Sequence, residues 1–362
     1  MSDDLDWYRG RRVLVTGHTG FKGSWLCLWL QQLGARVTGF ARTPEQPSLF
    51  ADAEVGAGMH SVIGDICDQV ALDDALCTAD PEIIFHLAAQ SLVRRSYDEP
   101  VETFATNVIG TVNLLNLARR HTGLRAVVNV TSDKCYENNG SGRPFLEADP
   151  MGGHDPYSAS KGAAELVAAA MERSFLRKAG IGLASARAGN VIGGGDWSAD
   201  RIVPDIVRAA LAGRPVQIRR PEAVRPWQHV LEPLRGYLML GQRLATEGRG
   251  FAGGWNFGPD SDAIVSVRAI LDGISRRWPD VRPEFSAHCA GPYEASVLRL
   301  DIAKVRARLG WHPVLSLDET LDLTVDWYVR TAHGPGSTRA LTLSQIEAFY
   351  LKTRQHEKVT PQ

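Results

Sequence analysis

The sequence predicts an α/β fold, a doubly wound parallel sheet with a smaller mixed C-terminal domain. Short β-branched runs alternate with longer helix-like stretches through the first half of the chain, as is typical of a parallel sheet with helices on both faces. A glycine-rich segment joins the first of these runs to the first helix. After Arg187 the alternation ends and loops rich in Gly, Pro, Arg and Trp begin, which predicts the second domain.

The expected elements follow in order along the chain. We expect strands at residues 12–16, 36–40, 61–64, 82–87, 126–130 and 183–187, and helices at 23–33, 101–120 and 157–177. Further helices are expected at residues 202–212, 234–245, 267–277, 302–309 and 317–330.

Composition and charge limit the classes of protein. The chain has 362 residues, 44% hydrophobic and 22% charged, enough to bury a sizeable core. A net charge of -1 argues against a broad basic surface that binds nucleic acid. Five scattered cysteines without a CxxC pair predict neither disulfides nor a metal site. A polar start and apolar runs no longer than a strand predict no signal peptide and no membrane span, so we expect a cytoplasmic protein.

The glycine-rich segment has the spacing GxxGxxG. It contains Gly17, Gly20 and Gly23, with Phe21 and Lys22 between them. Glycines here let the backbone approach a pyrophosphate, and the N-terminus of the following helix offers free N–H groups. The segment therefore predicts a dinucleotide-binding (Rossmann) domain at residues 1–187, to which residues 228–257 would return; residues 188–227 and 258–362 would form the substrate domain. A glycine loop needed only for packing is the alternative.

Two further positions bear on the cofactor. The second strand ends at Arg42 without the acid that binds the ribose hydroxyls of NAD. Arg42 favours NADP, whose 2′-phosphate it could pair with, unless it is only a surface arginine. Asp65 and Ile66 close the third strand, where the carboxylate could accept from an adenine amino group or cap the next helix.

A catalytic group is predicted from two segments. Tyr157 and Lys161 are four residues apart in a predicted helix, so both side chains lie on one face and the ammonium lowers the pKa of the phenol. Ser132, after the strand at 126–130, could hydrogen-bond the reacting oxygen. Asp133 and Lys134 follow it and could run a second proton transfer, although an acid and a lysine are also common in a solvated turn.

At this point the chain resembles a known family. The segments VTGHTGFKGSWL, IFHLAAQSLVRRSY, TSDKCYE, DPYSASKGAAEL and RAGNVIGGGDW are similar to those of the extended short-chain dehydrogenase/reductase superfamily, and within it to the nucleotide-sugar 4,6-dehydratases, above all those acting on CDP-glucose. The resemblance covers residues 12–313. It implies a lyase with bound NAD, in which Tyr157 deprotonates the 4-hydroxyl, Lys134 takes the C5 proton and Asp133 protonates the departing 6-hydroxyl.

The resemblance also implies roles for other residues. Cofactor-lining positions would be Leu87, Ala88, Ala89 and Asn107, and substrate-binding positions would be Gln90, Ser91, Asn190, Arg201, Arg225, His229 and Arg299. Two residues depart from the pattern: Ser91 stands where the family would have proline, and Tyr293 where it would have histidine.

Alternatives within and outside this family stay open. A 4-epimerase or reductase would need Ser132, Tyr157 and Lys161 but not the Asp133-Lys134 pair, and a dehydratase could act on a GDP-, dTDP- or UDP-linked sugar. A cofactor-sensing protein would need none of these catalytic residues. The resemblance further implies a homodimer formed by the helices at 101–120 and 157–177 of each subunit, in which small residues such as Ala164 and Ala168 would permit close packing.

Overall fold

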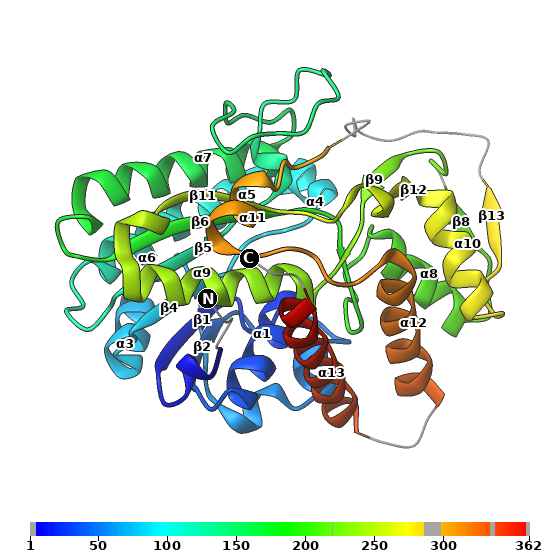
Figure 1. The fold of residues 1–362 in the computed structure, drawn as a ribbon, viewed down its shortest axis with the longest axis horizontal. Helices are drawn as coiled ribbons and strands as arrows, with labels where there is room; N and C mark the ends of the chain where they lie inside the picture. The colour runs from blue at the N-terminus through cyan, green and yellow to red at the C-terminus, as the bar shows by residue number, and fades with distance from the viewer. Residues whose placement is uncertain (1–4, 219, 286–297, 334–336, 360–362) are drawn as a thin grey trace.

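A seven-stranded parallel sheet forms the centre of the protein (Figure 1). The computed structural model describes residues 5–218, 220–285, 298–333 and 337–359. The sheet has the order β11-β6-β5-β4-β1-β2-β3, and all neighbours pair in parallel. The predicted doubly wound parallel sheet is confirmed. Its strands are β1 (Arg12–Thr16), β2 (Arg36–Ala41), β3 (His60–Ile63), β4 (Ile83–His86), β5 (Ala126–Val130), β6 (Gly182–Ala188) and β11 (Gly253–Phe257).

The strand order reverses between β1 and β4. The chain runs outward from β1 through β2 to β3, and then crosses to β4 on the other side of β1. Loops that leave the carboxyl ends of two such strands diverge, and the crevice between them is where open α/β sheets bind ligands. The fold therefore places the glycine loop after β1 opposite the loop after β4.

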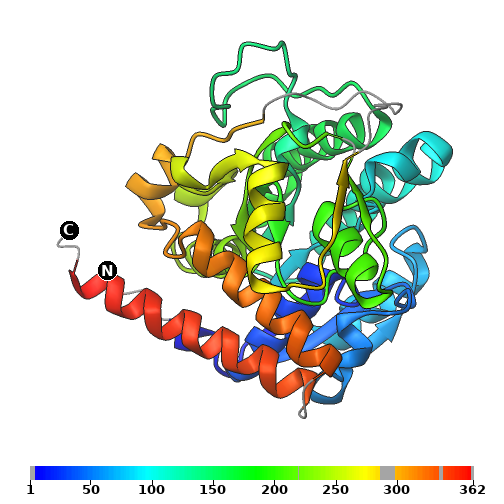
Figure 2. The same ribbon diagram turned by 90° about the vertical axis from the view of Figure 1, so that its right-hand side faces the viewer.

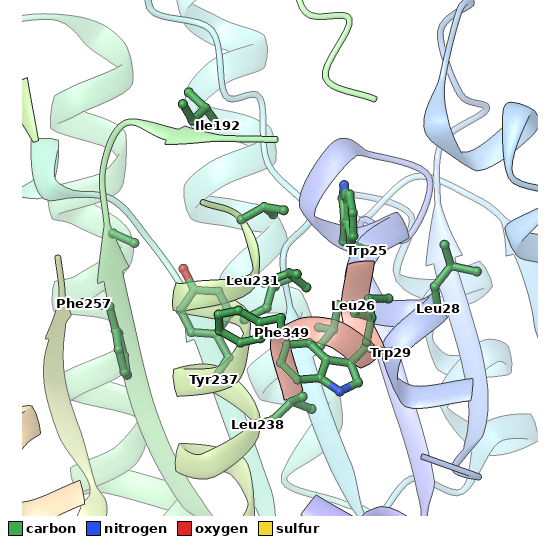
Figure 3. Close-up of a cluster of buried hydrophobic side chains, with 14 of the residues drawn as sticks. Trp25, Leu26, Leu28, Trp29, Ile192, Leu231, Tyr237, Leu238, Phe257 and Phe349 are labelled. Atoms are coloured by element: carbon green, nitrogen blue, oxygen red, sulfur yellow. The ribbon is translucent and has the colours of Figure 1, made fainter. Parts of the chain in front are cut away.

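Helices cover both faces of the sheet with separate apolar clusters. On one face α1 (Phe21–Gln32) and α9 (Leu231–Glu247) pack together. On the other face lie α3 (Gln69–Ala79), α6 (Gly110–Ala118) and α7 (Pro156–Met171). Figure 3 shows the first cluster, with both tryptophans of α1 beside α9. Each large buried side chain contributes about 1.5–3 kcal/mol, so this layer holds the strand ends in place.

Two predicted helices contain π-helical turns. The predicted helix at 101–120 consists of α5 (Pro100–Phe104), the π-helical η3 (Ala105–Ile109) and α6. The predicted helix at 157–177 consists of α7 and the π-helical η5 (Glu172–Leu176). The extent of both helices was predicted, but the local change from α to π was not, because one inserted residue barely disturbs the apolar spacing.

A smaller region lies beside the sheet. Figure 1 shows α8, α10, β8 and β13 grouped on one side of the molecule. Short strands pair there as β10-β7, β12-β9 and β13-β8. Residues 228–257 instead contribute α9 and β11 to the central layers. The elements of the smaller region are β7 (Val191–Ile192), α8 (Ile202–Leu211), β8 (Val216–Ile218), β9 (Val224–Pro226), β10 (Gln228–His229), β12 (Ile264–Ser266), α10 (Val267–Arg277) and β13 (Pro283–Phe285). Helix α11 (Ala303–Leu309) instead packs against β11 at the edge of the sheet.

Two long helices end the chain. Helix α13 (Thr338–Val359) follows α12 (Leu317–His333) and runs along the outside of the sheet region (Figure 2). Phe349 of α13 packs edge-to-face on Trp29 of α1, with ring centroids 5.8 Å apart. No helix among the described residues is both long enough and apolar enough to cross a membrane. Short elements complete the fold: η1 (Leu5–Tyr8), α2 (Leu49–Asp52), η2 (Val55–Gly58), α4 (Val93–Asp98), η4 (Asp133–Cys135), η6 (Gly248–Phe251) and η7 (Ser261–Ala263).

Candidate functional site

One large cavity lies at the carboxyl ends of the strands. Its volume is about 850 Å³, and both the sheet region and the smaller region line it. A cavity of this size suits a cofactor together with a substrate. The predicted site residues that line it are Gly17, Gly20, Phe21, Lys22, Gly23, Arg42, Ile66, Leu87, Ala88, Ala89, Gln90, Ser91, Ser132, Asp133, Lys134, Tyr157, Lys161, Asn190, Arg201 and Arg225.

The glycine loop approaches the loop after β4 very closely. Gly17 has a φ of +75°, and a Cβ there would lie 2.7 Å from the backbone nitrogen of Ala88. A Cβ on Gly23 would lie 2.1 Å from the carbonyl oxygen of Gly17. Any larger side chain at either position would clash with this backbone. Helix α1 begins at Phe21, so its free N–H groups and positive dipole end lie at the cavity, and the loop fits a dinucleotide pyrophosphate.

Arg42 at the end of β2 has an acidic partner. Its guanidinium donates a 2.6 Å hydrogen bond to the carboxylate of Glu102 in α5. This hydrogen bond and the attraction between the two opposite charges raise the pKa of Arg42 and lower that of Glu102. The charge that would attract a 2′-phosphate is therefore partly neutralised.

Ser132 begins the short helix η4, which carries the Asp133-Lys134 pair. Its hydroxyl oxygen accepts from the backbone N–H of Lys134 at 3.2 Å, and its hydroxyl donates to Oδ1 of Asp133 at 3.0 Å. Gly189 lies against the same carboxylate, since a Cβ there would come within 1.8 Å of Oδ2. Ser132 and Asp133 are buried, so the turn is held rigidly and is not a solvated one.

Tyr157 lies in the first turn of α7. Asp155 caps this helix by accepting from the backbone N–H of Ser158 at 2.9 Å, and the backbone N–H of Tyr157 donates to the hydroxyl of Ser96 at 3.1 Å. Burial raises the pKa of the phenol to about 12, while a hydrogen bond with Ser132 opposes that rise. The tyrosine is therefore fixed in the cavity with its phenol next to Ser132.

Lys161 follows one turn later on the same helix. Burial lowers the pKa of its ammonium to about 8, and the carboxylate of Glu165 opposes that effect. Its Nζ donates to the carbonyl oxygen of Val130 at 3.5 Å. Tyr157 and Lys161 thus lie on one face of α7, as their spacing predicted, and both line the cavity.

Two further cations face this group. Burial, and then the charge of Arg201, lowers the pKa of Lys22 to about 7. Arg201 donates to Asp196 at 2.9 Å and to the hydroxyl of Ser91 at 3.0 Å. A proline in place of Ser91 could not accept this hydrogen bond, so the departure from the family pattern at Ser91 has a structural role.

Some predicted binding residues do not line the cavity. Asp65 caps a turn by accepting from the backbone N–H of Cys67, and Asn107 clamps the backbone N–H and carbonyl of Gln90 from below. His229 is fully buried against Trp25. Arg299 lines a separate small pocket behind Asp133. Tyr293 lies outside the described residues.

Other functional positions were missed in the sequence. Three acidic residues interact with predicted cations of the site. Glu102 pairs with Arg42, Asp196 pairs with Arg201, and the charge of Glu165 acts on Lys161. Of these, Glu165 could have been found, because it lies four residues after Lys161 in a predicted helix. Glu102 lies 60 residues from Arg42, and Asp196 lies five residues before Arg201 outside any helix, so the spacing along the chain predicts neither contact.

Away from the cavity, three side chains of the described region bring possible metal-ligand atoms within 4.8 Å of one another. They belong to Asp73, Cys77 and His121. The scattered cysteines had predicted no metal site, and spacing along the chain could not reveal a group formed by two different segments.

Comparisons with known proteins agree with this geometry. The NAD dependent epimerase/dehydratase family matches residues 13–251. A CDP-glucose 4,6-dehydratase of Salmonella typhimurium is 50% identical over 331 residues, which cover 90% of this chain and 92% of the relative.

Two solved structures are also similar. An epimerase of Methanothermobacter thermautotrophicus aligns with a TM-score of 0.77 and 26% identity, over 91% of this chain and 95% of the other. MoeE5, solved with UDP-glucose and NAD, aligns with a TM-score of 0.73 and 27% identity, over 88% and 99% of the two chains.

Proposed function

The chain belongs to the NAD dependent epimerase/dehydratase family, and from this premise we propose that it is a lyase that dehydrates CDP-glucose to CDP-4-keto-6-deoxyglucose. The observation that carries the proposal is the group formed by Ser132, Asp133, Lys134 and Tyr157 on the wall of one cavity. A 4-epimerase needs the serine and the tyrosine, but its reaction includes no water loss that would require a second acid and base beside them. The activity of the half-identical Salmonella relative supports the same substrate.

The proposed cofactor is NAD, held by the glycine loop. The close approach of Gly17 to Ala88 leaves no room for a side chain at the glycine, and a loop without side chains lets the backbone come close to a pyrophosphate. When bound, NAD supplies the hydride chemistry, removing hydride from C4 of the sugar and returning it to C6. The ion pair of Arg42 with Glu102 favours NAD over NADP, because a 2′-phosphate would have to compete with the carboxylate.

Tyr157 is the proposed base for the first step. As phenolate it removes the proton of the sugar 4-hydroxyl, while Ser132 hydrogen-bonds the same oxygen. The hydrogen bond with Ser132 and the charge of Arg201 oppose the effect of burial on the pKa of the phenol, and the ammonium of Lys161 on the same face of α7 is the group proposed to favour the phenolate during the reaction. The new 4-keto group acidifies the C5 proton.

Asp133 and Lys134 are the proposed acid and base for the second step. Lys134 in its neutral form takes the C5 proton, and Asp133 protonates the 6-hydroxyl, which leaves as water. Both residues line the cavity beside Ser132, so all three proton transfers occur around one sugar ring.

We propose that the nucleotide lies between the two regions of the chain, the sheet domain of residues 1–187 with 228–257 and the substrate domain of the rest. Asn190, Arg201 and Arg225 line the cavity there. Asn190 has a φ of +44°, a conformation that is strained for most residues and is often found at ligand sites. Guanidinium groups suit the diphosphate because their donors match two oxygens. His229 and Arg299 would act behind the cavity wall.

The proposed assembly is a homodimer. Large apolar side chains are exposed along α5, η3, α7 and η5, a surface on which a monomer would show few of them. They are Val101, Phe104, Ile109, Leu166 and Phe175, with 81%, 39%, 53%, 62% and 44% of their surface exposed. Sedimentation of the parent and of Leu166→Glu tests the proposal: we expect a dimer and a monomer respectively, and a monomeric parent contradicts it.

The cytoplasm is the proposed place of action. The described cysteines Cys27, Cys67, Cys77 and Cys135 are free thiols, as is usual in a reducing compartment. Fractionation of cells that express the full chain tests this, and recovery outside the cytoplasmic fraction contradicts it.

One assay tests the proposed reaction. The purified protein is incubated with CDP-, dTDP-, GDP- and UDP-glucose, each with NAD, with NADP and without added cofactor. The 4-keto-6-deoxy product is followed by its absorbance in alkali. We expect product from CDP-glucose with NAD; no product from CDP-glucose under any condition overturns the proposal.

A further inference from the structure

Each turnover of the proposed reaction adds a proton to Tyr157 and removes one from Asp133. Tyr157 gains the proton of the 4-hydroxyl, and Asp133 loses one to the leaving water. Lys134 takes a proton from C5 and returns it there when hydride reaches C6. After one turnover the sugar has lost H₂O, the tyrosine carries an extra proton and the aspartate lacks one. The next turnover requires the net movement of one proton from Tyr157 to Asp133.

The hydroxyl of Ser132 lies between these two groups. It donates to Oδ1 of Asp133 at 3.0 Å and is hydrogen-bonded to the phenol of Tyr157. Because an ionised carboxylate can only accept, the serine hydroxyl donates to it, as the state after a turnover requires. A phenol that donates to Ser132 then completes a chain of two hydrogen bonds from donor to acceptor.

We propose that Ser132 relays the proton from Tyr157 to Asp133 and so resets the site between turnovers. The phenol O–H bond breaks and its proton forms a new O–H bond on Ser132. The former serine proton moves to Oδ1 of Asp133. This transfer forms the phenolate and the carboxylic acid needed for the next substrate, and no proton is exchanged with solvent. Because burial raises the pKa of the phenol to about 12, the transfer is drawn forward as the next substrate gives its 4-hydroxyl proton to the phenolate. The inference rests on the proposed dehydration.

Burial and packing favour this internal route. Tyr157, Ser132 and Asp133 have only 7%, 5% and 3% of their surface exposed. The second oxygen of Asp133, Oδ2, lies against Gly189, so Oδ1 is the oxygen within reach of the serine. The relay does not alter the free-energy difference between the two protonation states; it supplies a short path between them.

Ser132→Ala tests the relay by two rates. With enzyme in excess, the single-turnover rate reports the loss of the hydrogen bond to the sugar oxygen. The steady-state kcat also requires the reset. A positioned proton-transfer group contributes typically about 10²- to 10⁴-fold, so we expect kcat to fall at least roughly tenfold more than the single-turnover rate. Ser132→Thr keeps a hydroxyl and should restore the parent ratio.

Imidazole distinguishes a lost relay from a distorted site. At pH 7 it can both accept and donate a proton, so at constant ionic strength it should raise kcat of Ser132→Ala and leave its single-turnover rate unchanged. Ser160→Ala removes a buried hydroxyl of α7 that takes no part in the proposed relay. The kcat of this variant should not depend on imidazole. Equal losses in both rates of Ser132→Ala without imidazole rescue overturn the relay, while product formation by the parent upholds the proposed function separately.

Discussion

Arg187 and Glu165 form a buried, bidentate ion pair one helical turn beyond Lys161. The Nε and NH2 groups of the guanidinium each lie 2.8 Å from a carboxylate oxygen, and both side chains are 5% exposed. The hydroxyl of Thr131 donates to the same carboxylate at 2.5 Å. The pair therefore ties α7 to the ends of β5 and β6, one helical turn beyond Lys161.

Glu165→Gln should lower both the stability of the fold and the pKa of Lys161. Removal of one partner of a buried pair costs about 3–5 kcal/mol, because the other charge stays buried. Glu165 also opposes the effect of burial on the pKa of Lys161. Without it that pKa falls below about 8, so the lysine loses its proton sooner and activity declines at a lower pH. Urea unfolding and a pH–rate profile measure the two effects.

Glu222→Gln is the matched control for this prediction. Glu222 pairs with Arg268, and their side chains are 74% and 43% exposed. Such exposed pairs contribute about 0–1 kcal/mol. A loss of stability as large as that of Glu165→Gln would contradict the burial argument. An unchanged alkaline limb in Glu165→Gln would contradict the role assigned to its charge.

The sheet could be predicted because its signals are local. The strand at 12–16 was predicted with the bounds it has, since its apolar run ends at a glycine loop. Tyr157 and Lys161 share a face because four residues make about one helical turn. The predicted cofactor and catalytic residues converge because they follow the carboxyl ends of parallel strands, which lie at one edge of the sheet.

What could not be predicted depends on contacts between distant segments. Asn107 resembles a cofactor-lining residue, yet it lies in a π-helical turn and clamps the backbone of Gln90. His229 was expected at the substrate, but its ring packs against Trp25 of α1. In both cases the motif indicates the neighbourhood of the site, whereas tertiary packing decides whether the side chain faces the cavity or supports its wall.

Asp133→Asn should separate oxidation from water loss. The amide cannot protonate the leaving 6-hydroxyl, while Tyr157 and Lys161 remain in place. We expect reduced cofactor to build up at 340 nm after addition of CDP-glucose, with little product. Asp149→Asn changes a carboxylate that binds Arg143 outside the cavity and should not produce this signal. Normal product formation by Asp133→Asn would show that another group supplies the proton.

Glu102→Gln should increase the use of NADP. The substitution frees Arg42 from its 2.6 Å ion pair and leaves the guanidinium available for a 2′-phosphate. Because exposed pairs contribute up to about 1 kcal/mol, the kcat/KM ratio of NADP to NAD should rise by a factor of about 2 to 5. Glu99→Gln, which removes a partner of Arg95, should leave the ratio unchanged. No rise in Glu102→Gln would mean that Arg42 does not face the 2′ position.

His86 should make the fold sensitive to acid. Its ring lies between Thr16 and Thr111, with Nδ1 and Nε2 at 2.7 and 3.1 Å from their hydroxyls. Burial, and then the charge of Lys161, lowers the pKa of His86 from 6.5 to about 3. The unfolded chain therefore binds a proton at this position below pH 6.5, and the folded chain does not until about pH 3. Stability from this group is present above pH 6.5 and is lost as the pH falls toward 3.

His86→Asn removes the titration, and its effect can be isolated by comparing two pH values. Between pH 7 and pH 5 the linkage costs the parent about 2 kcal/mol at this histidine. The variant loses hydrogen bonds and is less stable at pH 7, but its free energy of unfolding should fall by about 2 kcal/mol less than that of the parent between the two pH values. Urea denaturation at pH 7 and pH 5 measures this difference. His60→Asn, at an exposed histidine, should keep the parent's pH dependence. If the variant at His86 also keeps it, the pKa of that ring does not differ between the folded and the unfolded chain.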